Sequence, residues 1–484
     1  MVGLVQNDAT GAPVPGIATS WETAPDGLSW TFHLRDALWS DGKPVTADDF
    51  VFGMQREVDP KTAAEYASIL YAIKGAQAVN TGKAPLGALG VHALDPHTLR
   101  IELTHPAPYL LQLAKHTAMM PAPRWAVQRW GEAWTQPGHY VTDGPFTLAD
   151  WVLNDHVALL KNPRFYEADQ VCLDEIVYYP TTDALSAERR VRRGELDIND
   201  GIKASRVAYL RRPDQIPTYV HVSTYLGVDY LAYNIRDVPA LRDRRVRQAL
   251  TMAVDRDFIN LKVGRGLSPS ADALVPPGTD NFPGSIKPYW AGWPFEQRKA
   301  EAKRLLGEAG YGPNKPLKLD LKIRGTNGAA FSFAAMQSDW KAIGVQLTLT
   351  RNEAAVAYAA FQAHDFKVAD ASWVADYNDP TSFLFLLHSD NAGFNYGSYK
   401  NPAFDALMAK ADKEPDVVKR GQYLVEAERI MLEDAPVAPW AYTISDALVS
   451  PRVSGWRDNL LNYHPARYLC FAGAQVSADK APGG

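Results

Sequence analysis

The sequence lacks the features that mark membrane-spanning and nucleic-acid-binding proteins. No apolar run is long enough to cross a bilayer, and no dense block of lysine and arginine occurs. The formal net charge of -5 is small for 484 residues, which argues against a nucleic-acid partner. Met1 leads directly into Val2–Val5 without the charged start or the apolar stretch of a signal peptide, so the chain taken literally is cytosolic.

Cysteine and the common catalytic motifs are also scarce or absent. The two cysteines, Cys172 and Cys470, neither require nor exclude an oxidising compartment, and sequence leaves open whether they lie close together. The motifs G-x-S-x-G and H-E-x-x-H and the P-loop do not occur. The eleven histidines are scattered without the spacing of metal ligands. We therefore expect no enzyme activity, no metal and no cofactor.

Length and local patterns predict an α/β protein of several domains. A chain of 484 residues is too long for one core, so two or three domains are expected. Alternation predicts a strand at Leu28–Leu34 with aromatic side chains on one face. Thr46 is expected to cap a helix, with Asp49 at the capping-box position. The other segments with clear signals are Glu296–Ala309, which is helix-like, and Leu317–Ile323 and Val345–Leu349, which are strand-like.

The most informative stretch is a predicted strand and the loop that follows it. Asp365–Ser372 is apolar enough to be a buried strand, and Trp373–Pro380 then places two acids among aromatic residues. Asp376 lies between Trp373 and Tyr377, where a carboxylate needs a cationic partner. On spacing alone a structural salt bridge to lysine or arginine is favoured. The alternative is a ligand ammonium, which the two rings could flank by cation–π attraction.

Two long, position-specific motifs near the start resemble a known family. They are Asp26–Arg35, preceded by Trp21, and Trp39–Phe50. Together they resemble the signature of the extracellular solute-binding proteins of oligopeptide and dipeptide ABC importers. The resemblance continues along essentially the whole chain, and the stretch from Trp373 is similar to the amine-anchor loop of oligopeptide receptors. This similarity outweighs the preference for a structural salt bridge, and it favours a ligand ammonium as the partner of Asp376.

The resemblance implies a two-lobed periplasmic binding protein fold of class II, with an extra domain in the first lobe and a ligand cleft between the lobes. The implied divisions are 1–125 for the extra α/β domain, 126–226 with 444–473 for the main domain of the first lobe, and 227–443 for the second lobe. Residues 474–484 are expected to be a disordered tail. The 13 tryptophans and 22 tyrosines suit an aromatic-lined cleft.

The function implied by the resemblance is the binding of short peptides and their delivery to the membrane permease of an ABC importer. The protein would be a periplasmic or extracytoplasmic monomer with no covalent step. Asp376 would take the α-ammonium, and Trp373, Val374 and Ala375 would pair with the peptide backbone. Further predicted ligand contacts are Tyr377, Tyr66, Tyr230 and Arg324. The alternatives are a peptide sensor or chaperone, or a receptor for a different peptide-like, nickel or haem ligand.

The chain departs from the family pattern in three respects. Met1 matches a point inside the mature domain, so a signal peptide and one or two strands are expected upstream. The second departure is the absence of a disulfide that related receptors can carry, because its two positions are occupied here by Gly227 and Val374.

The third departure concerns the family's anchors for a peptide carboxylate. Asp370, Ala329 and Gly264 replace an arginine, a histidine and a lysine at those positions. The change to aspartate reverses the local charge and would repel a carboxylate. Arg324 is a candidate substitute, and the alternative is that it pairs with an acid or lies in solvent.

Overall fold

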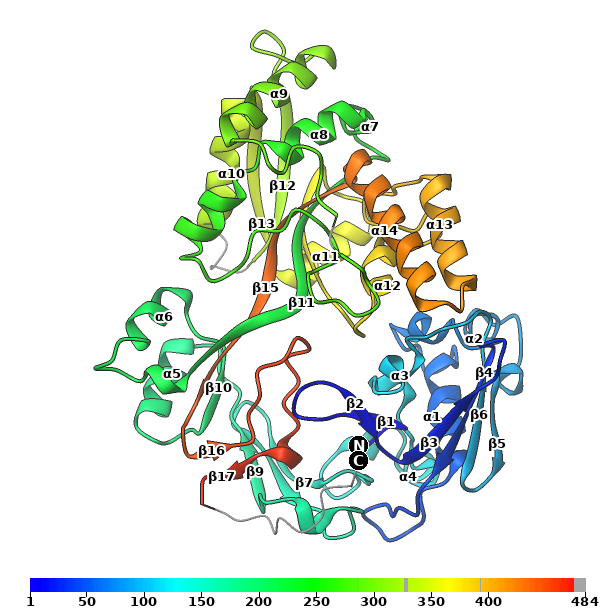
Figure 1. The fold of residues 1–484 in the computed structure, drawn as a ribbon. Coiled ribbons are helices and arrows are strands. Elements are labelled where there is room, and N and C mark those ends of the chain that lie inside the picture. The colour runs from blue at the N-terminus through cyan, green and yellow to red at the C-terminus, as the bar shows by residue number, and fades with distance from the viewer. Residues whose placement is uncertain (285, 326–329, 392, 474–484) are drawn as a thin grey trace. The chain divides into compact units, whose positions relative to one another are not determined.

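The computed structural model describes residues 1–284, 286–325, 330–391 and 393–473, and these form two compact units. Unit 1 consists of Met1–His221 and the described residues after Ser445, and unit 2 is Val222–Ser445. The chain passes from one unit to the other twice, within the long strands β11 (Val220–Tyr233) and β15 (Val437–Val449) (Figure 1). The predicted second lobe, 227–443, lies inside unit 2, while the division of unit 1 near residue 125 stays a prediction.

Unit 1 contains several small sheets and short helices. Its strands are β1 (Val5–Asn7), β2 (Pro13–Pro15), β3 (Ala18–Thr23), β4 (Ser29–Leu34), β5 (Val91–Asp95), β6 (Thr98–Glu102), β7 (Phe146–Val152), β8 (His156–Lys161), β9 (Glu175–Tyr178), β10 (Ile198–Asp200), β16 (Val453–Ser454) and β17 (Cys470–Phe471). Its helices are α1 (Ala47–Val58), α2 (Ala76–Asn80), α3 (Leu110–Leu113), α4 (Arg124–Trp130), α5 (Ala184–Arg192) and α6 (Ala204–Leu210). The larger sheets have the orders β3-β4-β6-β5 and β7-β8-β9.

Local chemistry explains the two elements that were predicted near the start. Buried and half-buried residues alternate along β4, so Trp30 and Phe32 both point into the core. Helix α1 begins after Thr46, whose backbone N–H donates to the Asp49 carboxylate at 2.9 Å. Both predictions are confirmed.

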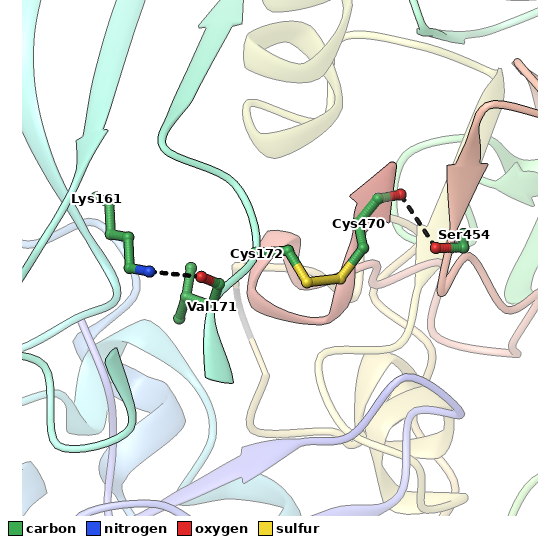
Figure 2. The surroundings of a disulfide bond; sticks show 5 residues. All are labelled: Lys161, Val171, Cys172, Ser454 and Cys470. Carbon is green, nitrogen blue, oxygen red and sulfur yellow. Dashed lines mark hydrogen bonds between the residues drawn. A yellow bond between two sulfur atoms is a disulfide. The ribbon is translucent and has the colours of Figure 1, made fainter. Parts of the chain in front are cut away.

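A disulfide joins Cys172 to Cys470 within unit 1, across 298 residues of sequence and a Cα–Cα distance of 5.2 Å. Figure 2 shows hydrogen bonds on both sides of it. Lys161 Nζ donates to the Val171 carbonyl at 2.7 Å, and Ser454 Oγ donates to the Cys470 carbonyl at 3.1 Å. The bond therefore attaches the C-terminal strand pair β16–β17 to the segment after β8.

Unit 2 is organised on the sheet that β11 and β15 enter. Its other strands are β12 (Leu317–Arg324), β13 (Val345–Asn352) and β14 (Val368–Val374). Its helices are α7 (Pro239–Arg242), α8 (Arg244–Met252), α9 (Phe295–Glu308), α10 (Ala330–Ala342), α11 (Ala354–Gln362), α12 (Thr381–Leu384), α13 (Pro402–Lys413) and α14 (Val417–Asp434). The sheet order is β10-β15-β11-β14-β12-β13, in which β10 pairs only with the unit 1 end of β15.

Strand β14 lies in the interior of this sheet, between β11 and β12, and the strand directions are mixed. Strand β14 is antiparallel to β11 and parallel to β12, which is also parallel to β13. Alternate residues of β12 are buried, and one core contains side chains such as Leu231, Leu321 and Trp340. The predicted segments correspond to α9, β12 and β13, and the predicted buried strand corresponds to β14. The loop that begins after Val374 is therefore held by an interior, well-packed strand.

Candidate ligand-binding site

The loop after β14 carries Asp376 on a short connection to α12. The backbone N–H of Asp376 donates to Ser382 Oγ at 3.1 Å, and the Tyr377 hydroxyl lies 3.3 Å from Thr381 Oγ1. Both contacts fasten the loop to the helix that follows it. The Asp376 side chain is half-buried. Burial, assisted by the negative charge of Asp376, raises the pKa of Tyr225, so this phenol is an electrostatic neighbour of the loop carboxylate.

The second acid of the loop, Asp379, forms the structural salt bridge. Its two oxygens each accept from Arg420 at 2.8 Å, and both side chains are fully buried. Asp379 also accepts from the hydroxyl of Thr381 at 2.7 Å. Arg420 lies 41 residues further along the chain, so no local pattern could have distinguished Asp379 from Asp376.

Trp373 belongs to a compact aromatic cluster. Its ring meets Phe385 and Phe394 edge-to-face, with centroid distances of 5.3 and 5.1 Å. Its indole N–H is buried, and no hydrogen-bond acceptor for it lies among the described residues. The ring that was predicted to flank the Asp376 site is thus held in a fixed orientation.

The backbone of β14 alternates between two sides. The N–H of Ala375 donates to the Leu226 carbonyl at 2.8 Å, and the N–H of Asn234 donates to the Lys367 carbonyl at 3.0 Å. Hydrogen-bonded and non-hydrogen-bonded pairs alternate in an antiparallel ladder. The odd-numbered residues of β14, including Trp373, therefore direct their backbone groups toward β11, and the even-numbered residues direct theirs away from it.

The side of β14 that faces away from β11 pairs with β12 along only part of the strand. In the described part of the chain, the register between β12 and β14 ends at Lys322↔Ala369. The backbone groups of Ser372 and Val374 therefore lie beyond that register, on the edge that leads to Asp376. Of Trp373, Val374 and Ala375, which were predicted to pair with the peptide backbone, only Val374 directs its backbone groups away from β11, as Ser372 also does; the three contacts stay predictions. The period-two geometry of a strand could have shown that only alternate residues are available.

Arg324, at the end of β12, lies in a network of acceptors. Nε and Nη2 donate to the two oxygens of Asp370 at 3.3 and 3.1 Å, and Nη2 also donates to Asp229 at 3.3 Å. Nη1 donates to the Tyr358 hydroxyl at 3.0 Å and to Ser372 Oγ. The geometry favours the ion-pair interpretation of Arg324, and its role as a carboxylate anchor stays a prediction.

Burial affects both acids of this network. Burial raises the pKa of Asp229 to about 6, against the opposing charge of Arg324. Burial also raises the pKa of Asp370, and the positive charge of Arg324 again opposes this increase.

The two predicted pocket tyrosines lie in different units. Tyr230 is buried in unit 2, where it lines a narrow cavity of about 10 Å³ together with Tyr396 and Phe394. Tyr66 lies in unit 1, with its ring edge-on to His116 at a centroid distance of 6.3 Å.

Gly227, at the family's disulfide position, is in register with Val374 and has no room for a side chain. A Cβ there would lie 2.1 Å from Thr443 Oγ1 and 3.1 Å from the Trp373 carbonyl oxygen. Of the other anchor positions, Gly264 lies in unit 2, and Ala329 lies outside the described residues.

Two features are absent from the described ranges. They contain no group of three or more histidine, cysteine, aspartate or glutamate side chains placed to hold a metal ion. They also contain no helix whose length and apolar character would let it span a membrane.

The chain is similar to several known proteins. Residues 12–395 match the model of the bacterial extracellular solute-binding proteins, family 5. The periplasmic oligopeptide-binding protein OppA of Escherichia coli (strain K12) is 40% identical over 459 residues, which cover 94% of this chain and 83% of that protein.

Solved structures extend the similarity. The murein tripeptide binding protein MppA of Escherichia coli superposes with a TM-score of 0.86 at 34% identity, covering 97% of this chain and 92% of that one. Haemophilus influenzae OppA in complex with RPPGFSPFR gives a TM-score of 0.85 at 31% identity, covering 97% of this chain and 93% of that one.

Two α/β units joined by two strand crossings define the two-lobed class of solute-binding proteins. The fold-class prediction is confirmed. The chain belongs to the bacterial extracellular solute-binding proteins, family 5, as the motifs near the start indicated.

Proposed function

We propose that this protein binds short peptides and presents them to the membrane permease of an ABC importer. The observation that carries the proposal is the part of β14 beyond its described register with β12, which leads into the loop of Asp376. A peptide would add there as a strand and pair with the backbone of Ser372 and Val374. Its α-ammonium would meet Asp376, and recognition would be largely independent of side chains.

The relatives support this proposal, since one is named as an oligopeptide-binding protein, one as a murein tripeptide binding protein, and one is in complex with RPPGFSPFR. The disulfide between Cys172 and Cys470 supports a periplasmic or extracytoplasmic location, where such bonds persist. The protein would act as a monomer without nucleic acid and without a covalent step. Trp373, Tyr377 and residues such as Tyr66 and Tyr230 would flank the ligand or support the residues that do.

The first test replaces the carboxylate that would meet the amine. Asp376→Asn should weaken the binding of a tripeptide by about 2–5 kcal/mol, as expected when one partner of a buried charge pair is removed. Titration calorimetry on both proteins measures the difference. Asp320→Asn is the control, because Asp320 is an acid of unit 2 paired with Lys367 at 3.1 Å. Unchanged affinity in Asp376→Asn would assign Asp376 a structural role only.

The second test changes the ligand instead of the protein. N-acetylation removes the charge of the peptide amine and leaves the loop carboxylate without that partner, which is costly in a half-buried site. Acetylated and free forms of one tripeptide should differ widely in affinity for the wild-type protein. Equal binding of the two forms would show that the amine is not the recognised group.

A further inference from the structure

The loop that carries Asp376 is hydrogen-bonded to a second segment of unit 2. The backbone N–H of Asp280 donates to Asn378 Oδ1 at 2.9 Å, and Asn281 Nδ2 donates to Asp379 Oδ2 at 3.3 Å. Each bond joins residues that are 98 positions apart, and the two bonds meet the loop at successive residues. Asn378 follows Asp376 by two residues. The second segment therefore holds the part of the loop beside the predicted amine anchor.

Residues 274–283 form this bracing segment, which is itself fixed to helix α14. The backbone N–H groups of Leu274 and Val275 donate to the fully buried carboxyl group of Glu428 at 3.0 and 2.8 Å. Arg420, on the same helix, binds the loop through its buried salt bridge. One helix therefore contacts both the loop and the segment that braces it.

The far end of the bracing segment lies directly against α14. A Cβ on Gly421 of that helix would lie 2.8 Å from the Asn281 carbonyl oxygen and 2.9 Å from Pro283 Cδ, so the close approach depends on glycine. Asn281 has a φ of +58°, in the left-handed region that asparagine adopts more readily than most residues. The segment and the helix are thus in tight contact where the Asn281 amide reaches Asp379.

We propose that Asn378 and Asn281 are positioning residues for the recognition of the peptide amine by Asp376. The inference rests on the proposed peptide-binding function and adds the residues that hold its anchor. A loop that is fixed before the ligand arrives loses less conformational freedom on binding, so its carboxylate binds an ammonium more tightly. Both asparagines act through Asp376 and not through contacts of their own with the ligand.

The test compares trialanine with N-acetyl-trialanine by titration calorimetry on the wild-type protein and two variants. Asn378→Ala removes the acceptor for the Asp280 N–H. Asn281→Gly removes the side-chain amide and keeps a residue that adopts a positive φ at no steric cost. In each variant the ratio of the affinities for trialanine and N-acetyl-trialanine should fall about tenfold, equivalent to about 1.4 kcal/mol. The affinity for the acetylated peptide should change little, because that peptide has no ammonium for Asp376 to bind.

Asn401→Ala is the matched control. Asn401 also accepts from two backbone N–H groups, at the start of α13, and it donates to Asp434 at 2.7 Å. Its replacement should lower the thermal midpoint and keep the affinity ratio of the wild type. Thermal midpoints of all variants therefore separate a loss of stability from a loss of amine recognition.

A double-mutant cycle tests whether Asn378 acts through Asp376. Residues that act on one interaction have non-additive effects. In the Asp376→Asn background the anchor carboxylate is absent, so adding Asn378→Ala should change the affinity for trialanine little. An equal loss of affinity in the wild-type and Asp376→Asn backgrounds would overturn the inference.

The outcomes separate the inference from the proposed function. An affinity ratio that stays at the wild-type value in both Asn378→Ala and Asn281→Gly would overturn the inference and leave peptide binding intact. Equal binding of the two peptides to the wild-type protein would overturn it as well, because Asp376 would then not recognise the amine. If neither peptide binds the wild-type protein, the proposed function itself fails.

Discussion

The buried carboxyl group of Glu428 makes the stability of unit 2 depend on pH. Glu428 lies on α14 and is fully buried. Its Oε1 accepts from the backbone N–H groups of Leu274 and Val275 at 3.0 and 2.8 Å, and no partner for Oε2 lies among the described residues. Burial raises the pKa of Glu428 to about 8, although both hydrogen bonds act in the opposite direction.

The size and sign of the effect follow from this pKa. The ordinary pKa is 4.5, so between about pH 4.5 and pH 8 the folded protein holds one proton more than the unfolded chain. The stabilisation is fully present below pH 4.5 and is lost as the pH rises through 8. At about 1.4 kcal/mol per pH unit, the free energy of unfolding should fall by about 3 kcal/mol between about pH 5 and pH 7.5.

Glu428→Gln removes this titration and keeps the acceptor for the two backbone N–H groups. The variant should gain stability relative to the wild type by about 3 kcal/mol over the same pH interval. Urea unfolding followed by circular dichroism at several pH values measures the difference. Glu426→Gln is the control, because Glu426 lies on the same helix but is 48% exposed. A difference in the free energy of unfolding between wild type and Glu428→Gln that stays constant across this pH interval would refute the reasoning.

Two further substitutions test contacts that maintain the fold. Asp379→Asn should destabilise the protein by about 3–5 kcal/mol, because it leaves the charge of Arg420 buried without its partner. Asp376→Asn should change the thermal midpoint little by comparison, and equal losses in the two variants would contradict the roles assigned to the two acids. Replacing Cys172 and Cys470 together by serine should lower the free energy of unfolding by about 4–5 kcal/mol, since the bond closes a long loop. Urea midpoints that match those of the oxidised wild type would contradict this expectation.

Local sequence patterns predicted the elements whose signals are local. The alternation in β4, the cap at Thr46 and the apolar run that became β14 each depend on neighbouring residues. The position of the Asp376 loop followed from the same run, because an apolar strand must end where acids and proline begin. Family resemblance added the two-lobed fold, which local patterns could not provide.

The remaining features depend on residues that are distant in sequence. The assignment of the salt bridge to Asp379 required Arg420, and the Arg324 network required a third strand to bring in Asp229. Spacing along one chain cannot show such pairs. The pairing of Cys172 with Cys470 was open for the same reason.

The disulfide also defines a covalent ring that contains the whole of unit 2. Because Cys172 precedes Val222 and Cys470 follows Ser445, unit 2 is an insertion within that ring. The ring can close only after every residue of unit 2 has been synthesised, so this bond cannot guide the early folding of the chain. A single proteolytic cut anywhere in unit 2 would leave one covalent molecule, and the two pieces would separate on denaturing gels only after reduction.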